Sequence, residues 1–261
     1  MDNVIRDKFN KMGARSQLIE DPRASVRIDV LRDRHGEYFQ IRHGTDVNVT
    51  VLDVRPKDRH LLLMARSGMN RPNAVKSKFL CGHDERHWFV AAVPENQPAR
   101  DVQSAKDALK PAEVWEAIRR FDVPMSDRDL RKTDGFIRQG EWFFLPRPWM
   151  KVNLAMVLRS EPIRRGRGKP HICQELYRQG GEQVWVCRSY PNGLNAKEYR
   201  ALPEDQRKKL PWRVMVRDAR VFVRGSVRHS DHRTVWLPCW HQVVMNTETQ
   251  AAAMAHVAFL D

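Results

Sequence analysis

Short apolar runs, separated by polar segments, dominate the first hundred residues of the chain. Runs of this kind, rich in β-branched and aromatic residues, occupy 37–43, 46–54, 60–66, 76–83 and 87–94. Runs of this length and composition are typical of β-strands. The last two runs flank a polar tip at Asp84 and Glu85, which predicts a β-hairpin. Ahead of the strands, apolar residues at helical spacing within 4–12 predict a short helix.

The pattern changes near residue 98. A polar, proline-containing segment at 94–101 is predicted to be a linker, and a helical insert is expected near 102–133. One side of the predicted central helix carries Val114, Trp115, Ile118 and Phe121. A further short helix is expected over 126–132, with Ser126 as its cap. Two helices followed by a hairpin also occur in winged helix-turn-helix proteins, but the zero net charge of 101–150 favours a structural insert.

Strand-like runs return in the C-terminal part. They occupy 154–160, 169–179, 183–189, 219–229 and 233–245, and a final helix is expected over 247–260. The predicted fold class is therefore α+β, β-rich, with mostly antiparallel hairpins in two sheet-containing halves and the helical insert between them. The expected divisions are 1–97, 98–135 and a basic part, 136–261; the alternative is one continuous domain.

Charge narrows the expected partners. The 261 residues include 46 Lys and Arg against 32 Asp and Glu, a formal net charge of +14. Most of the excess lies beyond residue 150. A surplus of this size favours polyanions, nucleic acid first (DNA and RNA are not distinguished) and an acidic protein partner second. Without a long apolar run or a signal peptide, a cytoplasmic protein with no membrane partner is expected.

Two groups of basic residues are candidates for the nucleic-acid surface. The first is a loop in which glycines separate the basic residues Arg164, Arg165, Arg167 and Lys169. The second is one face of a predicted hairpin, with Arg224, Arg228 and Arg233. A turn at Ser230–Asp231 would place Arg228 directly opposite Arg233, an arrangement that repels unless an anion lies between them. The alternative is that these side chains extend into water.

The cysteines and histidines suggest a metal site. Two Cys-x-His units, Cys81 with His83 and Cys239 with His241, together offer a Cys₂His₂ set for zinc. Residues i and i+2 share a face of a strand, so each unit could present both ligands to one ion. The one-residue spacing matches no established zinc motif, and buried thiols with hydrogen-bonded histidines explain the same residues.

A polar turn in the last hairpin is the candidate catalytic site. His229, Asp231 and His232 could act as a general acid–base group, or could surround an ion together with His241 in a metal-dependent hydrolase such as a nuclease. An ordinary polar turn has the same composition. The first hypothesis for the whole chain is nucleic-acid binding through the basic C-terminal part. The alternatives are a metal-dependent hydrolase and a non-catalytic accessory module that binds an acidic protein.

Overall fold

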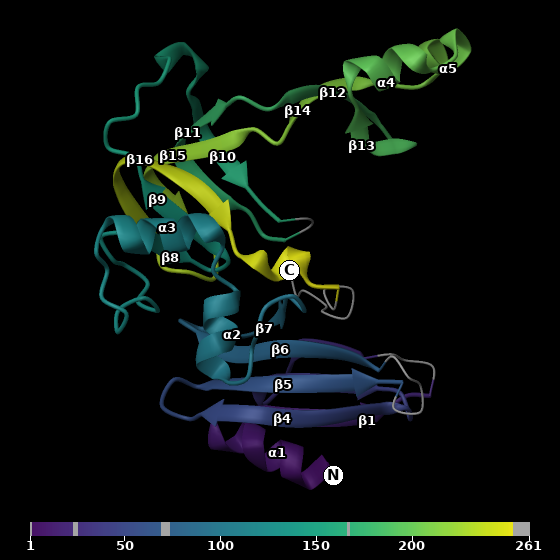
Figure 1. Cartoon of the computed structure of the whole chain (residues 1–261), viewed down its shortest axis with the longest axis vertical. Helices are drawn as coiled ribbons and strands as arrows, with labels where there is room; N and C mark the ends of the chain where they lie inside the picture. Colours follow the sequence, from purple (N-terminus) through teal and green to yellow (C-terminus); the bar gives the residue numbers. More distant parts are fainter. Residues whose placement is uncertain (1, 23–25, 69–73, 166–167, 253–261) are drawn as a thin grey trace.

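The computed structural model describes residues 2–22, 26–68, 74–165 and 168–252. It is β-rich, with several sheets whose pairings are antiparallel except for one (Figure 1). The predicted α+β class and the mostly antiparallel hairpins are therefore confirmed in outline. No helix of the described ranges is long and apolar enough to cross a bilayer.

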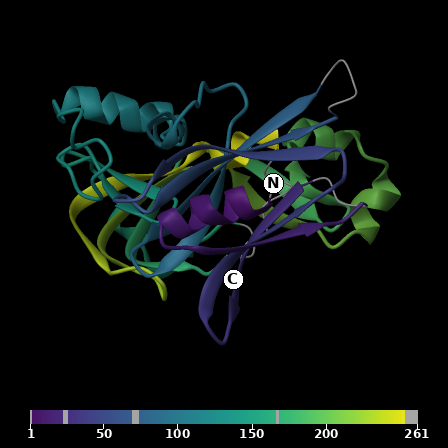
Figure 2. The ribbon, with the colours of Figure 1, turned by 90° about the horizontal axis from the view of Figure 1, so that it is seen from below.

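Two sheets and a helix build the N-terminal half. One sheet has the order β1-β3-β2, and the other is the meander β4-β5-β6-β7. The elements are α1 (Asp2–Lys11), β1 (Arg15–Glu20), β2 (Val26–Asp33), β3 (Gly36–His43), β4 (Val47–Arg55), β5 (His60–Ser67), β6 (Val75–Asp84) and β7 (His87–Val93). β1 runs parallel to β3, and α1 lies beside β1 and β4. α1 is at the lower end of the molecule in Figure 1 and therefore lies over the strands in Figure 2, which is seen from below.

The apolar run of β5 shows why this half holds together. Leu61 and Leu63 belong to the core that the two sheets share with Phe9 of α1, whereas Leu62 faces the other way and packs on a second core. The helix α2 (Val102–Ala108) covers that second face. Both faces of β5 are thus buried, so the run is continuously apolar instead of alternating.

The helical insert has two helices, α2 and α3 (Ala112–Arg120). Asp101 caps α2, and its carboxylate accepts a hydrogen bond from the backbone N–H of Ser104. The short helix predicted over 126–132 is wrong, because that segment forms turns. There Arg128 and Asp129 reach back to Asp107 and Lys110, so their side chains tie the turns to α2.

A six-stranded antiparallel sheet, in the order β10-β11-β15-β16-β9-β8, forms the C-terminal half. Its strands are β8 (Ile137–Gln139), β9 (Trp142–Pro146), β10 (Leu158–Ile163), β11 (His171–Gln179), β15 (Arg220–Arg228) and β16 (Val235–Met245). Two short 3-10 helices, η1 (Leu154–Met156) and η2 (Thr247–Gln250), complete it. Only the start of the final helix expected over 247–260 is described, and it is η2; residues 253–260 lie outside the described part.

An arm is inserted between β11 and β15 and extends away from the body (Figure 1). It contains β12 (Glu182–Cys187), β13 (Tyr190–Leu194), α4 (Ala196–Ala201), α5 (Glu204–Lys209) and β14 (Arg213–Arg217). Its small sheet has the order β13-β12-β14.

The last hairpin differs in register from the prediction. β15 and β16 pair Val227 with Val235, so the loop between them is longer than a two-residue turn at Ser230–Asp231. Val227, Val235 and Leu237 therefore share a face, so Leu237 is buried and Trp236 is exposed. A bulge next to Gly225, whose φ is +83°, shifts the register once more, further from the loop.

Candidate metal centre

Three histidines meet at one end of the six-stranded sheet. His171 begins β11, and His229 and His232 lie in the loop between β15 and β16. One ring nitrogen of each lies within 4.8 Å of the others, and no other set of three or more candidate ligands forms in the described ranges. The His171 and His229 rings stack with centroids 4.1 Å apart, and the His229 and His232 centroids are 4.8 Å apart.

Strand pairing brings the histidines together. β11 and β15 are antiparallel neighbours, and Ile172 pairs with Arg228. One step further along each strand are His171 and His229, which are therefore adjacent across the sheet edge. The loop then turns back, so that the ring of His232 also stacks on the ring of His171.

Gln139 of β8 fixes the orientation of His171. The side chain of Gln139 is fully buried, and the amide Nε2 of Gln139 donates to the carbonyl oxygens of Val227 at 3.3 Å and Arg233 at 2.6 Å. Its Oε1 therefore faces His171, where it lies 2.8 Å from Nδ1. Because an amide oxygen only accepts, Nδ1 of His171 carries the proton and Nε2 keeps its lone pair. This is the arrangement by which an outer partner orients a metal-binding histidine.

The other two rings are also held in place. The backbone N–H of Asp231 donates to Nδ1 of His229 at 3.1 Å. Nδ1 of His232 is buried and has no hydrogen-bond partner within the described chain. The ring of His232 rests on Gly140, where an added Cβ would lie 2.8 Å from its Nε2 and where φ is +58°. Gly140 thus both makes the β8–β9 turn and leaves room for the ring.

Burial keeps two of the three histidines, His171 and His232, uncharged. It lowers the pKa of His171 to about 3, with a further contribution from the charges of His229 and His232. Burial likewise lowers the pKa of His232 to about 4, and His229 adds to the effect. Both rings are therefore neutral near pH 7. Neutral imidazole is the form that binds metal ions.

Carboxylates and cations surround the histidines. Glu141 Oε2 lies 3.9 Å from Nε2 of His171. Asp231 forms an ion pair with Lys169 at 3.0 Å. Burial acts to raise the pKa of Asp231, but hydrogen bonds from Lys169 and Ser230 hold it below its usual range.

The tip of the β6–β7 hairpin reaches the same loop from the N-terminal half. Glu85 accepts a hydrogen bond from the backbone N–H of Arg233 at 2.6 Å. Arg131 forms ion pairs with both Asp84 and Glu85. The loop that carries His229 and His232 is thus fixed by contacts from both halves.

The structure does not bring together the four residues predicted to bind zinc. Cys81 is buried in the N-terminal core, and His83 packs against Trp88 with centroids 4.9 Å apart. Cys239 and His241 lie on β16, in a different sheet, where Nδ1 of His241 is 2.8 Å from the carbonyl oxygen of Cys239. Each Cys-x-His unit thus belongs to its own strand in its own sheet. His241 is also separate from the histidine cluster, which gains His171 in its place.

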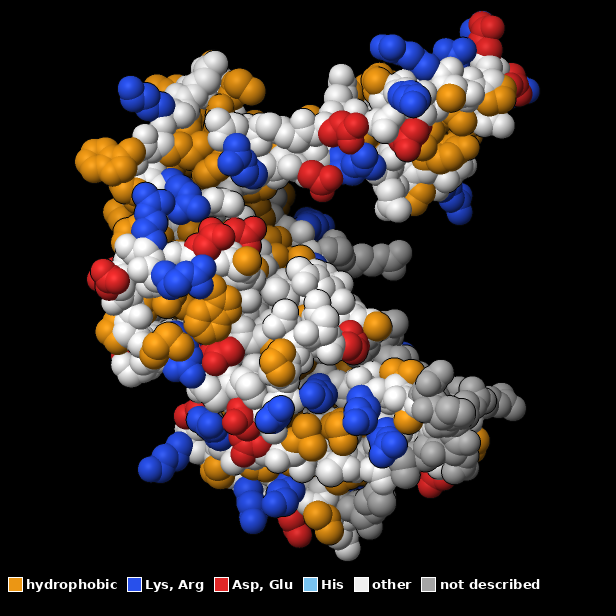
Figure 3. All heavy atoms as spheres, viewed as in Figure 1, with side chains coloured by type: hydrophobic (Ala, Val, Ile, Leu, Met, Phe, Trp, Pro, Cys, Tyr) orange, Lys and Arg blue, Asp and Glu red, His pale blue; other side chains and the backbone are white. Residues whose placement is uncertain are grey.

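Three of the cations predicted to face phosphate are paired with carboxylates. Arg224 binds Glu175 at 2.6 Å and Arg165 binds Glu248 at 2.7 Å, and Lys169 binds Asp231. On the face shown in Figure 3, Lys and Arg side chains are spread along the molecule with Asp and Glu among them. The predicted set thus includes residues that stabilise the fold as ion pairs.

The remaining predicted cations are exposed or undescribed. Arg228 and Arg233 are exposed and flank the loop of the histidine cluster, and Arg164 is exposed on the loop after β10. Arg167 lies outside the described residues. Arg228 does not pair with Arg233, because the β15–β16 ladder ends at Val227 and Val235 and both arginines lie beyond its last pair. The repulsion expected between two opposed arginines is therefore avoided.

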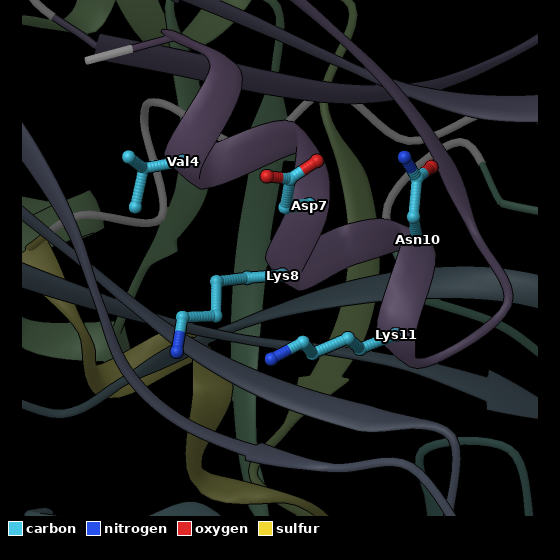
Figure 4. A pocket seen from close by; sticks show the side chains of 5 residues that line it. All are labelled: Val4, Asp7, Lys8, Asn10 and Lys11. Atoms are coloured by element: carbon cyan, nitrogen blue, oxygen red, sulfur yellow. The ribbon is translucent and has the colours of Figure 1, made fainter.

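A shallow hollow on α1 offers no comparable chemistry. It is lined by Val4, Asp7, Lys8, Asn10 and Lys11, all from one helix (Figure 4). Their side chains come from one outer surface and do not converge on a common point from several elements.

Replacing Gln139 by leucine is expected to lower the free energy of unfolding by at least about 2 kcal/mol, because three buried polar groups lose their partner. Urea denaturation measures this change. Gln183→Leu, at an exposed position of β12, is the matched control and is expected to change stability by less than about 0.5 kcal/mol. Equal effects of the two substitutions would contradict the anchoring role of Gln139.

Comparison of the chain with protein-family models, with curated proteins and with solved structures found no match. Inferences about function therefore rest on the chemistry of the histidine cluster and its surroundings.

Proposed function

We propose that His171, His229 and His232 bind a divalent transition-metal ion, with zinc the best fit, and that the site hydrolyses phosphate esters in a polyanionic substrate. The observation that carries this proposal is the convergence of three imidazole nitrogens within 4.8 Å. Three histidines are a ligand set of catalytic zinc sites, which keep a fourth position open.

The spacing supports binding with a small adjustment. Nitrogens bound tetrahedrally to one zinc at about 2.0–2.1 Å lie roughly 3.4 Å apart. Closing the present spacing to that value requires side-chain shifts on the order of 1 Å. It also requires the rings to rotate, because they stack at 21–26° to one another and an imidazole lone pair lies in the ring plane. The buried and unpartnered Nδ1 of His232 favours such a shift, because a buried polar atom gains a partner.

The surrounding residues fit hydrolysis. A zinc ion in such a site supplies an activated water near neutral pH. Glu141 Oε2, 3.9 Å from Nε2 of His171, is close enough to the cluster that it would take up a proton from such a water. Gln139 keeps Nε2 of His171 unprotonated, so this nitrogen is able to bind the ion.

The charges nearby favour an anionic substrate. Arg228 and Arg233 stand on either side of the cluster loop with exposed side chains, and arginine binds phosphate oxygens in a bidentate manner. With the net charge of +14, this makes nucleic acid the best candidate for the substrate.

The proposal is tested by loading metal-stripped protein with zinc or manganese and assaying three substrates. These are bis(p-nitrophenyl) phosphate, fluorescein-labelled single-stranded DNA and fluorescein-labelled RNA. Cleavage of at least one is expected with metal, and none with a chelator or in His229→Ala. The control His35→Ala changes an exposed histidine of the β2–β3 turn and is expected to keep activity. Metal-loaded protein that cleaves none of them would overturn the catalytic proposal.

A second candidate is nucleic-acid binding without chemistry, and the exposed arginines Arg228 and Arg233 favour it. It predicts an affinity that falls steeply with salt but is unchanged by a chelator. Gel-shift assays at two salt concentrations, with and without chelator, separate it from the hydrolase. Affinity that does not change with salt would contradict it.

A further inference from the structure

The arm has an internal structure of its own. Trp185 and Tyr199 stack with centroids 4.8 Å apart and planes 9° from parallel. Tyr190 and Trp212 stack at 5.5 Å, and Tyr199 meets Trp212 edge-on. This aromatic cluster joins α4 to the sheet and gives the arm a fixed shape outside the body.

β14 is an edge strand of the arm. Its neighbour is β12, with Val184 opposite Met215, and the described chain places no strand on its other side. Val214, Met215 and Val216 are 54%, 54% and 56% exposed. Because successive residues point to opposite faces, the strand is apolar and accessible on both of them. An exposed apolar edge is a template for pairing with another strand.

A second copy of β14 is a poor occupant. The strand reads Arg-Val-Met-Val-Arg from Arg213 to Arg217, the same in both directions. An in-register partner of identical sequence therefore places arginine opposite arginine, whether it runs parallel or antiparallel. Like charges that oppose each other directly across a ladder destabilise it.

We propose that β14 is a docking edge for an extended acidic segment of a partner protein, which adds a fourth strand to the arm sheet. Main-chain hydrogen bonds would supply affinity, and side chains at alternate positions would supply specificity. The segment would present apolar residues to Val214 and Val216 and carboxylates to the flanking arginines.

Arg213 supplies the main charge for this recognition. Its side chain is exposed, and no described carboxylate lies within ion-pair distance of it. Arg217 is partly compensated, because it binds Glu182 of β12 at 2.7 Å. Nucleic acid is a weaker fit for this edge, since valine and methionine offer no flat face on which bases stack.

The test uses the full chain and fluorescence polarisation with two labelled peptides. The probe is fluorescein-Ser-Glu-Val-Leu-Val-Glu-Ser, and its partner carries Lys in place of both Glu residues. The acidic peptide is expected to bind at least about tenfold more tightly than the basic one, a difference typical of complementary against like charges. Arg213→Glu is expected to reverse this preference. Arg200→Glu, an exposed arginine of α4, is the matched control and is expected to retain it.

Several results would overturn the proposal. Equal binding of the two peptides, or an unchanged preference in Arg213→Glu, would exclude recognition of acidic strands at β14. Sedimentation equilibrium is expected to show a monomer. A dimer that dissociates in Val216→Lys would show that a second copy occupies the edge. Because the peptides contain no phosphate ester, the outcome is independent of the proposed hydrolase activity.

Discussion

Zinc affinity is expected to fall by about 100-fold or more when His171 is replaced by alanine, because a ligand is lost and losing an outer-shell partner alone typically costs about 10–100-fold. His171 is also the ligand whose tautomer the structure fixes most firmly, through Gln139. Isothermal titration of metal-stripped protein with zinc measures the change. One zinc per chain is expected for the wild type.

Two controls separate this effect from loss of folding and from zinc bound elsewhere. His35→Ala removes an exposed histidine and is expected to bind zinc like the wild type. Cys239→Ala removes a residue of the alternative ligand set and is likewise expected to have no effect. Circular dichroism shows whether His171→Ala remains folded. Unchanged zinc affinity in folded His171→Ala would contradict the assignment of this ligand.

Replacing Lys110 by methionine is expected to destabilise the protein by about 3 kcal/mol, since removing one partner of a buried ion pair leaves the other uncompensated. The Lys110 side chain is 5% exposed, and its Nζ lies 2.7 Å from Asp129 and 3.0 Å from Asp107. In this variant Asp129 keeps Gln103 as a partner and Asp107 keeps Arg128. The loss of stability is therefore expected at the lower end of the range for broken buried ion pairs.

The control is an ion pair of the same type on the surface. Lys208 binds Glu204 at 2.6 Å, but its side chain is 76% exposed. Lys208→Met is expected to change stability by about 0.5 kcal/mol or less. Thermal and urea denaturation of both variants give the comparison. If the two substitutions had equal effects, Lys110 would not anchor the turns after α3 to α2.

The strands of the chain were accessible to sequence reasoning because most of them bury one face. The run 60–66 and the hairpin around Asp84 and Glu85 were predicted correctly, and the structure has strands at both. The faces of the last hairpin depend on the length of its loop. The loop between β15 and β16 is longer than the predicted two-residue turn at Ser230–Asp231, and a shift of register by one residue exchanges the two faces of a strand, so Trp236 is exposed and Leu237 is buried.

The candidate site was only half predictable. His229 and His232 lie close together in the sequence, whereas His171 joins them through the pairing of β11 with β15. Alternation along a single strand does not reveal which strand will be its neighbour. Gln139 was overlooked for the same reason, since its three hydrogen bonds reach residues at least 32 positions away. The contact of Gly140 with His232 likewise joins two turns that are about 90 residues apart, and no local pattern connects them.

The most direct test of the metal centre is X-ray absorption spectroscopy of the zinc-loaded full chain. Three imidazole nitrogens at about 2.0–2.1 Å and no sulfur are expected in the first shell. A sulfur ligand at about 2.3 Å, or the absence of stoichiometric zinc, would contradict a site formed by His171, His229 and His232.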